Sequence, residues 1–184
     1  MEQTANKTNK WELFIGAAFI VYLFLLFKII LLKWNFISLD ALWYHFKTFL
    51  HHPYLIYERQ ANFKLFDEIS RDIGDINGLS ISGSILFSNL IGNTLAFIPL
   101  GIFMAELIQS KRALCIKVVM LSFLLSLFFE STQFFLGIGI FDVDDLLLNT
   151  VGGMMGYIAW KIVKVGVKVL QPTTARGIKR TSHT

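Results

Sequence analysis

Long stretches without charged side chains limit this chain to a membrane environment. Residues 76–105 carry no charge, and three other apolar runs, at 13–32, 118–136 and 146–165, are interrupted by at most two ionisable side chains. A helix needs about 20 mostly apolar residues to cross the hydrocarbon core of a bilayer. Charged residues make up 16% of the chain, against roughly 25% in an average soluble domain. An ordinary soluble domain and a disordered chain are therefore excluded.

These runs predict an all-α fold, a polytopic membrane bundle of four transmembrane helices. We expect the helices at residues 13–32, 85–108, 113–136 and 146–165. Between them we expect a polar N-terminus at 1–12, a long mixed loop at 33–84, an acidic loop at 137–145 and a basic tail at 166–184. The long loop is rich in aromatic side chains, which favour the membrane interface. Whether residues 35–57 enter the membrane stays open.

Basic residues predict the orientation, because cytoplasmic loops carry an excess of Lys and Arg. Eleven of the 17 basic residues fall on one side if both termini are cytoplasmic. They are Lys7, Lys10, Lys111, Arg112, Lys117, Lys161, Lys164, Lys168, Arg176, Lys179 and Arg180. The predicted loop at 137–145 contains three Asp and no base, as expected of an outer loop. We therefore interpret the positive charge as an orientation signal and expect no nucleic-acid partner.

Polar and small side chains recur at helical spacing in three of the predicted spans. The series are 89, 93 and 96; 122, 126, 130, 133 and 137; and 145, 149, 152 and 156. Steps of three and four place each series on one helical face, and such faces turn toward each other in a membrane. The predicted result is an outward-facing polar cluster beneath the acidic loop. Its members are Asn89, Asn93, Glu130, Gln133, Asp142, Asp144, Asp145 and Asn149.

Each feature also has a purely structural interpretation. Gly152 and Gly156, spaced by four, predict close helix packing, and Pro99 with Gly101 predicts a kink. Asp142 or Asp144 can cap the fourth helix, and Asp145 can complement its dipole. Asn93 can simply tie two helices together.

Glu130 is the least easily explained by structure alone, because an ionisable group inside a membrane is costly. The carboxylates match no complete Ca²⁺ loop, so no metal and no cofactor are expected. The single cysteine, Cys115, excludes an internal disulfide framework and any cysteine-based metal site.

Three segments in this order resemble the VanZ-like family of small bacterial membrane proteins. They are the segments 93–101 (NTLAFIPLG), 130–133 (ESTQ) and 141–153 (FDVDDLLLNTVGG), within a family-like core at 89–157. The positions that match are Asn93, Phe97, Pro99, Gly101, Glu130, Gln133, Asp142, Asp145, Asn149 and Gly152.

The resemblance implies a protein of the cytoplasmic membrane, from a Gram-positive bacterium, associated with resistance to the glycopeptide antibiotic teicoplanin. Two departures from the family pattern are visible. Leu65 stands where a proline is usual, and residues 136–139 offer no arginine before the acidic loop. A cation from the long loop would have to replace that arginine, or Glu130 would be neutral.

Three functions remain open. The first is non-enzymatic binding of a lipid head group, a lipid-linked cell-wall intermediate or the antibiotic, because an acidic pocket suits amine-bearing groups. The second is an enzyme acting on a lipid-linked envelope substrate, with Glu130 as general acid or base. The third is a small proton-coupled transporter using Glu130. The sequence specifies neither the ligand nor the oligomeric state, and an oligomer remains open.

Overall fold

The computed structural model describes the backbone of residues 2–31, 38–66 and 81–170, and the side chains of 10–31, 38–66 and 91–169. Four long helices dominate this part of the chain. They are α1 (Glu2–Ile30), α4 (Ile81–Leu107), α5 (Leu114–Leu136) and α6 (Val143–Leu170). The shorter elements are α2 (Leu39–His51), the 3-10 helix η2 (Pro53–Glu58), and the strands β1 (Ala61–Asn62) and β2 (Phe141–Asp142).

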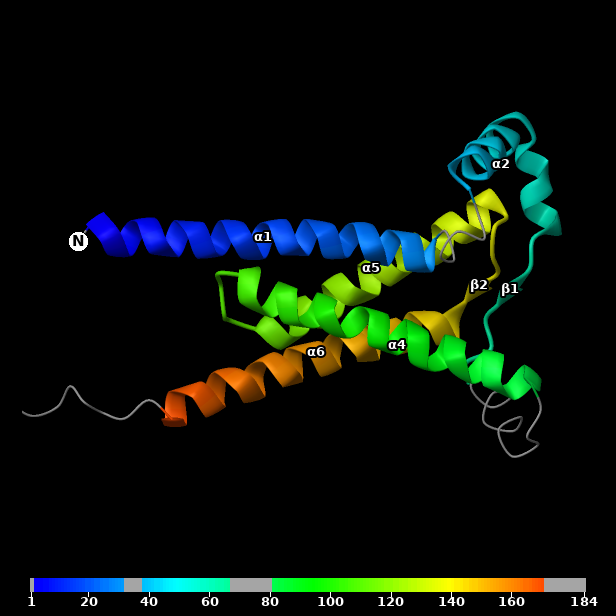
Figure 1. Ribbon diagram of the computed structural model, residues 1–184. Helices are drawn as coiled ribbons and strands as arrows, with labels where there is room; N and C mark the ends of the chain where they lie inside the picture. Colours follow the sequence, from blue (N-terminus) through cyan, green and yellow to red (C-terminus); the bar gives the residue numbers. More distant parts are fainter. Residues whose placement is uncertain (1, 32–37, 67–80, 171–184) are drawn as a thin grey trace, which may run out of the picture.

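The long helices lie side by side and alternate in direction (Figure 1). α1 and α5 run toward the end that carries α2, β1 and β2, whereas α4 and α6 run away from it. Three helical stretches, Lys10–Ile30, Leu114–Leu136 and Val143–Val169, are long and apolar enough to cross a membrane. The described part of α4 contains a shorter apolar stretch, Ile91–Leu107. The predicted all-α membrane bundle is confirmed, while the count of four crossings stays a prediction.

Glycines let α4 and α6 approach each other backbone to backbone. A Cβ built on Gly152 would collide with the carbonyl oxygen of Thr94, and one on Gly156 with that of Ile98. Gly101 faces α6 in the same way, so each helix presents small residues to the other. Such close approach is typical of helices in lipid. No hydrophobic force drives them together there, so association depends on close packing.

Pro99 lies inside α4, which continues to Leu107. Proline in a transmembrane helix is tolerated when neighbouring groups satisfy the freed carbonyl. The kink predicted at Pro99 and Gly101 stays a prediction.

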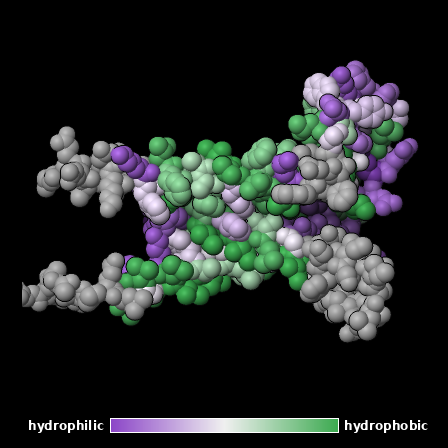
Figure 2. All heavy atoms as spheres, viewed as in Figure 1, coloured by the Kyte–Doolittle hydropathy of each residue, from purple (hydrophilic) through white to green (hydrophobic). Residues whose placement is uncertain are grey.

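Two groups of buried apolar side chains hold the bundle together. The larger joins α1, α4 and α5 near the end where β1 and β2 lie, and the smaller joins α4 and α5 near their connection. Members of the larger are Leu26, Ile30, Leu31, Phe97, Leu100 and Phe129. Figure 2 shows hydrophobic side chains across the middle of the bundle and hydrophilic ones gathered toward its two ends, as expected of a molecule surrounded by lipid.

The described part of the predicted loop at 33–84 contains secondary structure that the apolar pattern does not reveal. α2, η2 and β1 all lie there, and β1 pairs in parallel with β2, with Ala61 opposite Phe141 and Asn62 opposite Asp142. α6 begins at Val143, so Asp144 and Asp145 belong to its first turn instead of the preceding loop.

Candidate acidic site

The carboxylates predicted to cluster do gather where β2 leads into α6. Glu130, near the end of α5, is 2% exposed, and Asp142 and Asp144 are also buried. An oxygen (Oε2) of Glu130 accepts a hydrogen bond from the backbone N–H of Asp142 at 3.1 Å. This contact joins the last turns of α5 to the start of α6, so Glu130 points into the protein and not at lipid.

Asp142 is the N-cap of α6. Its Oδ1 accepts the backbone N–H of Asp144 at 2.8 Å, which satisfies one of the free N–H groups of the first helical turn. Its Oδ2 accepts the side-chain amide of Asn62 at 2.9 Å. The capping interpretation of Asp142 is thus realised, and the same carboxylate fastens β1 to the site.

The segment after β1 covers Asp144. The backbone N–H of Phe66 donates to Asp144 Oδ1 at 2.6 Å. Phe66 has a φ of 66°, in the left-handed region that a bulky residue adopts only when its surroundings hold it there. The Asn62 side chain accepts the N–H of Lys64 at 3.1 Å, which shapes the turn leading to Phe66. A segment almost 80 residues earlier in the chain therefore forms one wall of the acidic site.

Arg59 brings a cation to the neighbouring turn. Its guanidinium lies directly against Gly137, the C-cap of α5, where a built Cβ would collide with the Nη1 nitrogen. Gly137 also has a φ of 65°, so both the backbone and the contact require glycine there. Arg59 therefore places a cation from the long loop beside residues 136–139.

Asp145 lies at the α4 side of the site. Its Oδ1 accepts the side-chain amide of Asn93 at 2.7 Å, and both residues are partly exposed. Asn93 therefore ties α4 to the start of α6, as its structural interpretation expected. Asn89 is in α4 as well, but its side chain lies outside the described residues.

Gln133 and Asn149 bond away from the carboxylates. Gln133 donates to the carbonyl oxygen of Ile30 at 2.8 Å, at the end of α1. Asn149 donates to the hydroxyl of Ser126 at 2.9 Å, deeper between α5 and α6. Both are buried, and each adds a polar contact between two helices.

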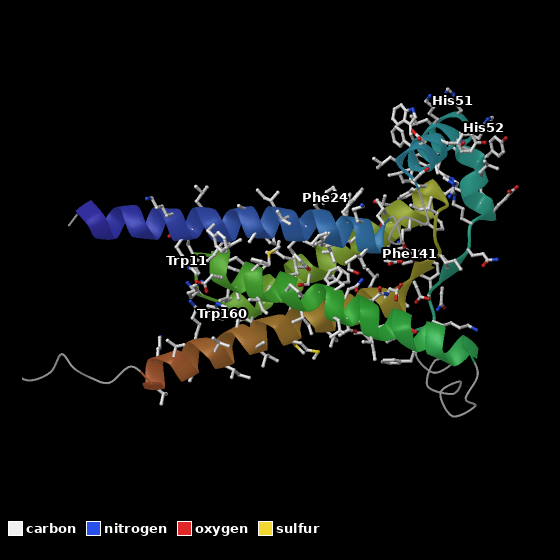
Figure 3. All side chains as sticks on the ribbon, viewed as in Figure 1. Trp11, Phe24, His51, His52, Phe141 and Trp160 are labelled. Carbon is white, nitrogen blue, oxygen red and sulfur yellow. The ribbon has the colours of Figure 1, made fainter. Side chains whose placement is uncertain are left out.

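The opposite end of the bundle is basic. There Glu106 of α4 accepts the indole N–H of Trp160 at 2.6 Å and pairs with Lys164 at 2.9 Å. Lys111 donates to the carbonyls of Ala105 and Ile108, at the end of α4. Figure 3 shows Trp160 and Trp11 near this end, with Phe141, His51 and His52 at the other.

Metal binding has no support from the described side chains. Among residues 10–31, 38–66 and 91–169, no group of three or more His, Cys, Asp or Glu is arranged to hold an ion. The contacts described above supply the carboxylates of the acidic site with backbone and amide N–H donors.

Sequence reasoning missed the contributions of Asn62 and the Phe66 backbone to this site. From the sequence, the segment at 59–66 offers only Leu65 in place of a usual proline, and the long loop only an unspecified cation. A two-residue parallel strand pair carries no periodic signal, so its partner cannot be read from spacing.

Two comparisons with known proteins found a match to this chain. The VanZ/LLP1 family profile matches residues 19–164, a range that includes α2, β1 and all of the carboxylates described above. Protein VanZ of Enterococcus faecium is 36% identical over 70 residues, which cover 38% of this chain and 42% of that protein. No solved structure matches. Because the profile spans most of its length, the chain belongs to the VanZ/LLP1 family.

Proposed function

We propose that this chain is a multi-pass protein of a bacterial cytoplasmic membrane, with both termini in the cytoplasm and the acidic site outside. The proposal is supported by the separation of charge along the bundle. The start of α1, the α4–α5 connection and the end of α6 lie together at one end (Figure 1), and Lys10, Arg112 and Lys168 belong to them. Cytoplasmic ends of membrane helices are enriched in such residues.

The acidic site binds an amine-bearing group in this proposal. The observation that carries it is the convergence of Glu130, Asp142, Asp144 and Asp145 around the first turn of α6, at the end of the bundle opposite Lys10, Arg112 and Lys168. Asp145 and Asn93 are partly exposed and form the rim that a ligand meets first.

The ligand class is a lipid head group, a lipid-linked cell-wall intermediate or a glycopeptide antibiotic. Each can reach an outward-facing site at the membrane boundary, and each class includes amine-bearing members. Family membership supports a contribution to teicoplanin resistance or envelope homeostasis in a Gram-positive cell. In this proposal the protein binds its ligand and does not change it chemically.

The test is teicoplanin sensitivity of a susceptible host that expresses the protein. We expect the inhibitory concentration to rise with the wild-type chain and to fall back with Asp145→Asn. That change keeps an oxygen for Asn93, removes the charge at the rim and replaces the other carboxylate oxygen with an NH2 group. Asp40→Asn, on α2 and outside the acidic site, is the matched control and should keep resistance. Unchanged sensitivity while the intact wild-type protein is present in the membrane rejects the resistance role.

Chemical analysis separates binding from catalysis. Extracted lipids and wall precursors should be identical with and without the protein. A modified precursor that disappears with Glu130→Gln would replace the binding role with an enzymatic one. Solute uptake into proteoliposomes that depends on both pH and Glu130 would replace it with proton-coupled transport.

A further inference from the structure

One side of α2 is an apolar stripe that the described part of the chain leaves uncovered. It consists of Leu39, Trp43, Phe46 and Leu50, which follow steps of four, three and four residues and so share one helical face. Their side chains are between 40% and 68% exposed, and α2 has no buried residue at all. Single exposed apolar side chains are common on proteins, whereas several gathered in one patch mark a contact surface.

A neighbouring side of α2, which packs against the bundle, fixes the position of the stripe along the bundle. Leu42 packs against the larger apolar cluster at the end of α1, and the ring of Phe49 lies 5.7 Å from that of Phe135. Phe135 is one residue from the end of α5. A helix of 23 residues is about 34 Å long, close to the roughly 30 Å of a hydrocarbon core. α2 therefore sits level with one boundary of the membrane.

Apolar side chains at the neighbouring helix ends are exposed as well. At the same level, Phe135 of α5 and Ile29 of α1 are 43% and 42% exposed. Beside the stripe runs a polar face with Asp40, Lys47 and His51. The ammonium group of Lys47 lies 5.3 Å from the centre of the Trp43 ring, which combines an aromatic body with a charge directed toward water.

We propose that this α2 stripe inserts into the bilayer interface at the acidic end of the bundle. The formal charges of Asp40 and Lys47 cancel, so the contact depends on apolar insertion and not on an oppositely charged partner. Tryptophan and a flanking lysine are the side chains that settle at this depth. Since α2 leads through η2 to Arg59 and β1, the insertion holds one wall of the acidic site at the level of the lipid head groups.

The test measures the surroundings of each α2 residue in the full-length protein. Cys115 is the single cysteine, so Cys115→Ser gives a background for one spin label at each of the 13 positions of α2. The protein is reconstituted in vesicles of zwitterionic phosphatidylcholine. Accessibility to oxygen, which concentrates in lipid, is compared with accessibility to a water-soluble nickel chelate.

We expect the two accessibilities to oscillate out of phase along α2 with a period of about 3.6 residues. Oxygen should dominate at Leu50→Cys and Phe46→Cys, and the nickel chelate at the matched control His51→Cys. Dominance of the nickel chelate at all three positions would place the stripe in water and overturn the proposal. Low values for both reagents at the stripe would mean that another protein or a second copy covers it, which also overturns it.

Each label replaces an exposed or partly exposed side chain, so single variants should keep the fold. Trp43 provides a second measurement. With the other three tryptophans changed to phenylalanine, lipids brominated near the head group should quench its fluorescence more than acrylamide does. Stronger quenching by acrylamide contradicts insertion. Neither result depends on teicoplanin sensitivity, so this proposal and the proposed function can fail separately.

Discussion

Replacing Gly137 with alanine tests whether the long loop closes over the end of α5. Two costs are expected. The φ of 65° lies in the left-handed region, which is about 1–2 kcal/mol unfavourable for an L-residue with a Cβ. In addition, the new methyl group would displace the Arg59 guanidinium; because this is the far end of a flexible side chain, the lower end of the overpacking cost applies, about 1 kcal/mol. Gly137→Ala should therefore lower the free energy of unfolding by about 2–3 kcal/mol.

A double-mutant cycle separates the two costs. Arg59→Ala removes the colliding group but leaves the backbone conformation unchanged. In that background, Gly137→Ala should cost only about 1–2 kcal/mol. The predicted coupling of about 1 kcal/mol exceeds the roughly 0.5 kcal/mol within which independent sites add.

The assay is equilibrium unfolding of the purified protein in detergent micelles, titrated with dodecyl sulfate and followed by far-ultraviolet circular dichroism. All four proteins of the cycle are compared at one micelle composition. If Gly137→Ala costs the same with and without Arg59, the guanidinium does not lie against Gly137. The contact between the loop and the end of α5 would then be refuted.

Three further substitutions test other parts of the bundle in the same assay. Gly156→Leu would collide with an α4 carbonyl and should abolish folded protein. Gly166→Leu, with open space beside it on the same helix, should not. Equal yields of folded protein from the two variants would contradict the close α4–α6 packing. Asn149→Ala removes the bond to Ser126 and should cost about 0.6–1.7 kcal/mol, so unchanged stability would argue against that bond. Ala113→Gly relieves a φ of 52° and should stabilise by about 0.5–1 kcal/mol; destabilisation would contradict this backbone conformation.

Much of the fold follows from the sequence because the solvent is lipid. Uncharged runs of sufficient length must be helices when no water is present to satisfy the backbone. Spacings of three and four then place Glu130 on the side of α5 that faces α6, where the structure has it. Polar and small residues are scarce in such helices, so their positions indicate which side of a helix faces its neighbours.

The rest could not be predicted because it depends on pairing over long distances in sequence. Asn62 reaches Asp142 through a strand pair only two residues long, and Phe66 reaches Asp144 through its backbone, which has no residue signature. Gln133 shares a helical face with Glu130, yet its amide bonds to the end of α1. Two residues on one helical face can be predicted to lie close together, but the hydrogen-bond partner of each cannot.

In the proposed orientation the acidic site faces outward and the basic end of the bundle is cytoplasmic. The most direct test of this orientation uses single cysteines in the Cys115→Ser background, at Ile140→Cys beside the acidic site and Thr181→Cys in the C-terminal tail. Intact cells are treated with a membrane-impermeant maleimide, and lysed cells serve as the control for reactivity. In intact cells we expect the maleimide to label the cysteine at position 140 and not the one at 181. Labelling at 181 and not at 140 would place the carboxylates in the cytoplasm and contradict this orientation.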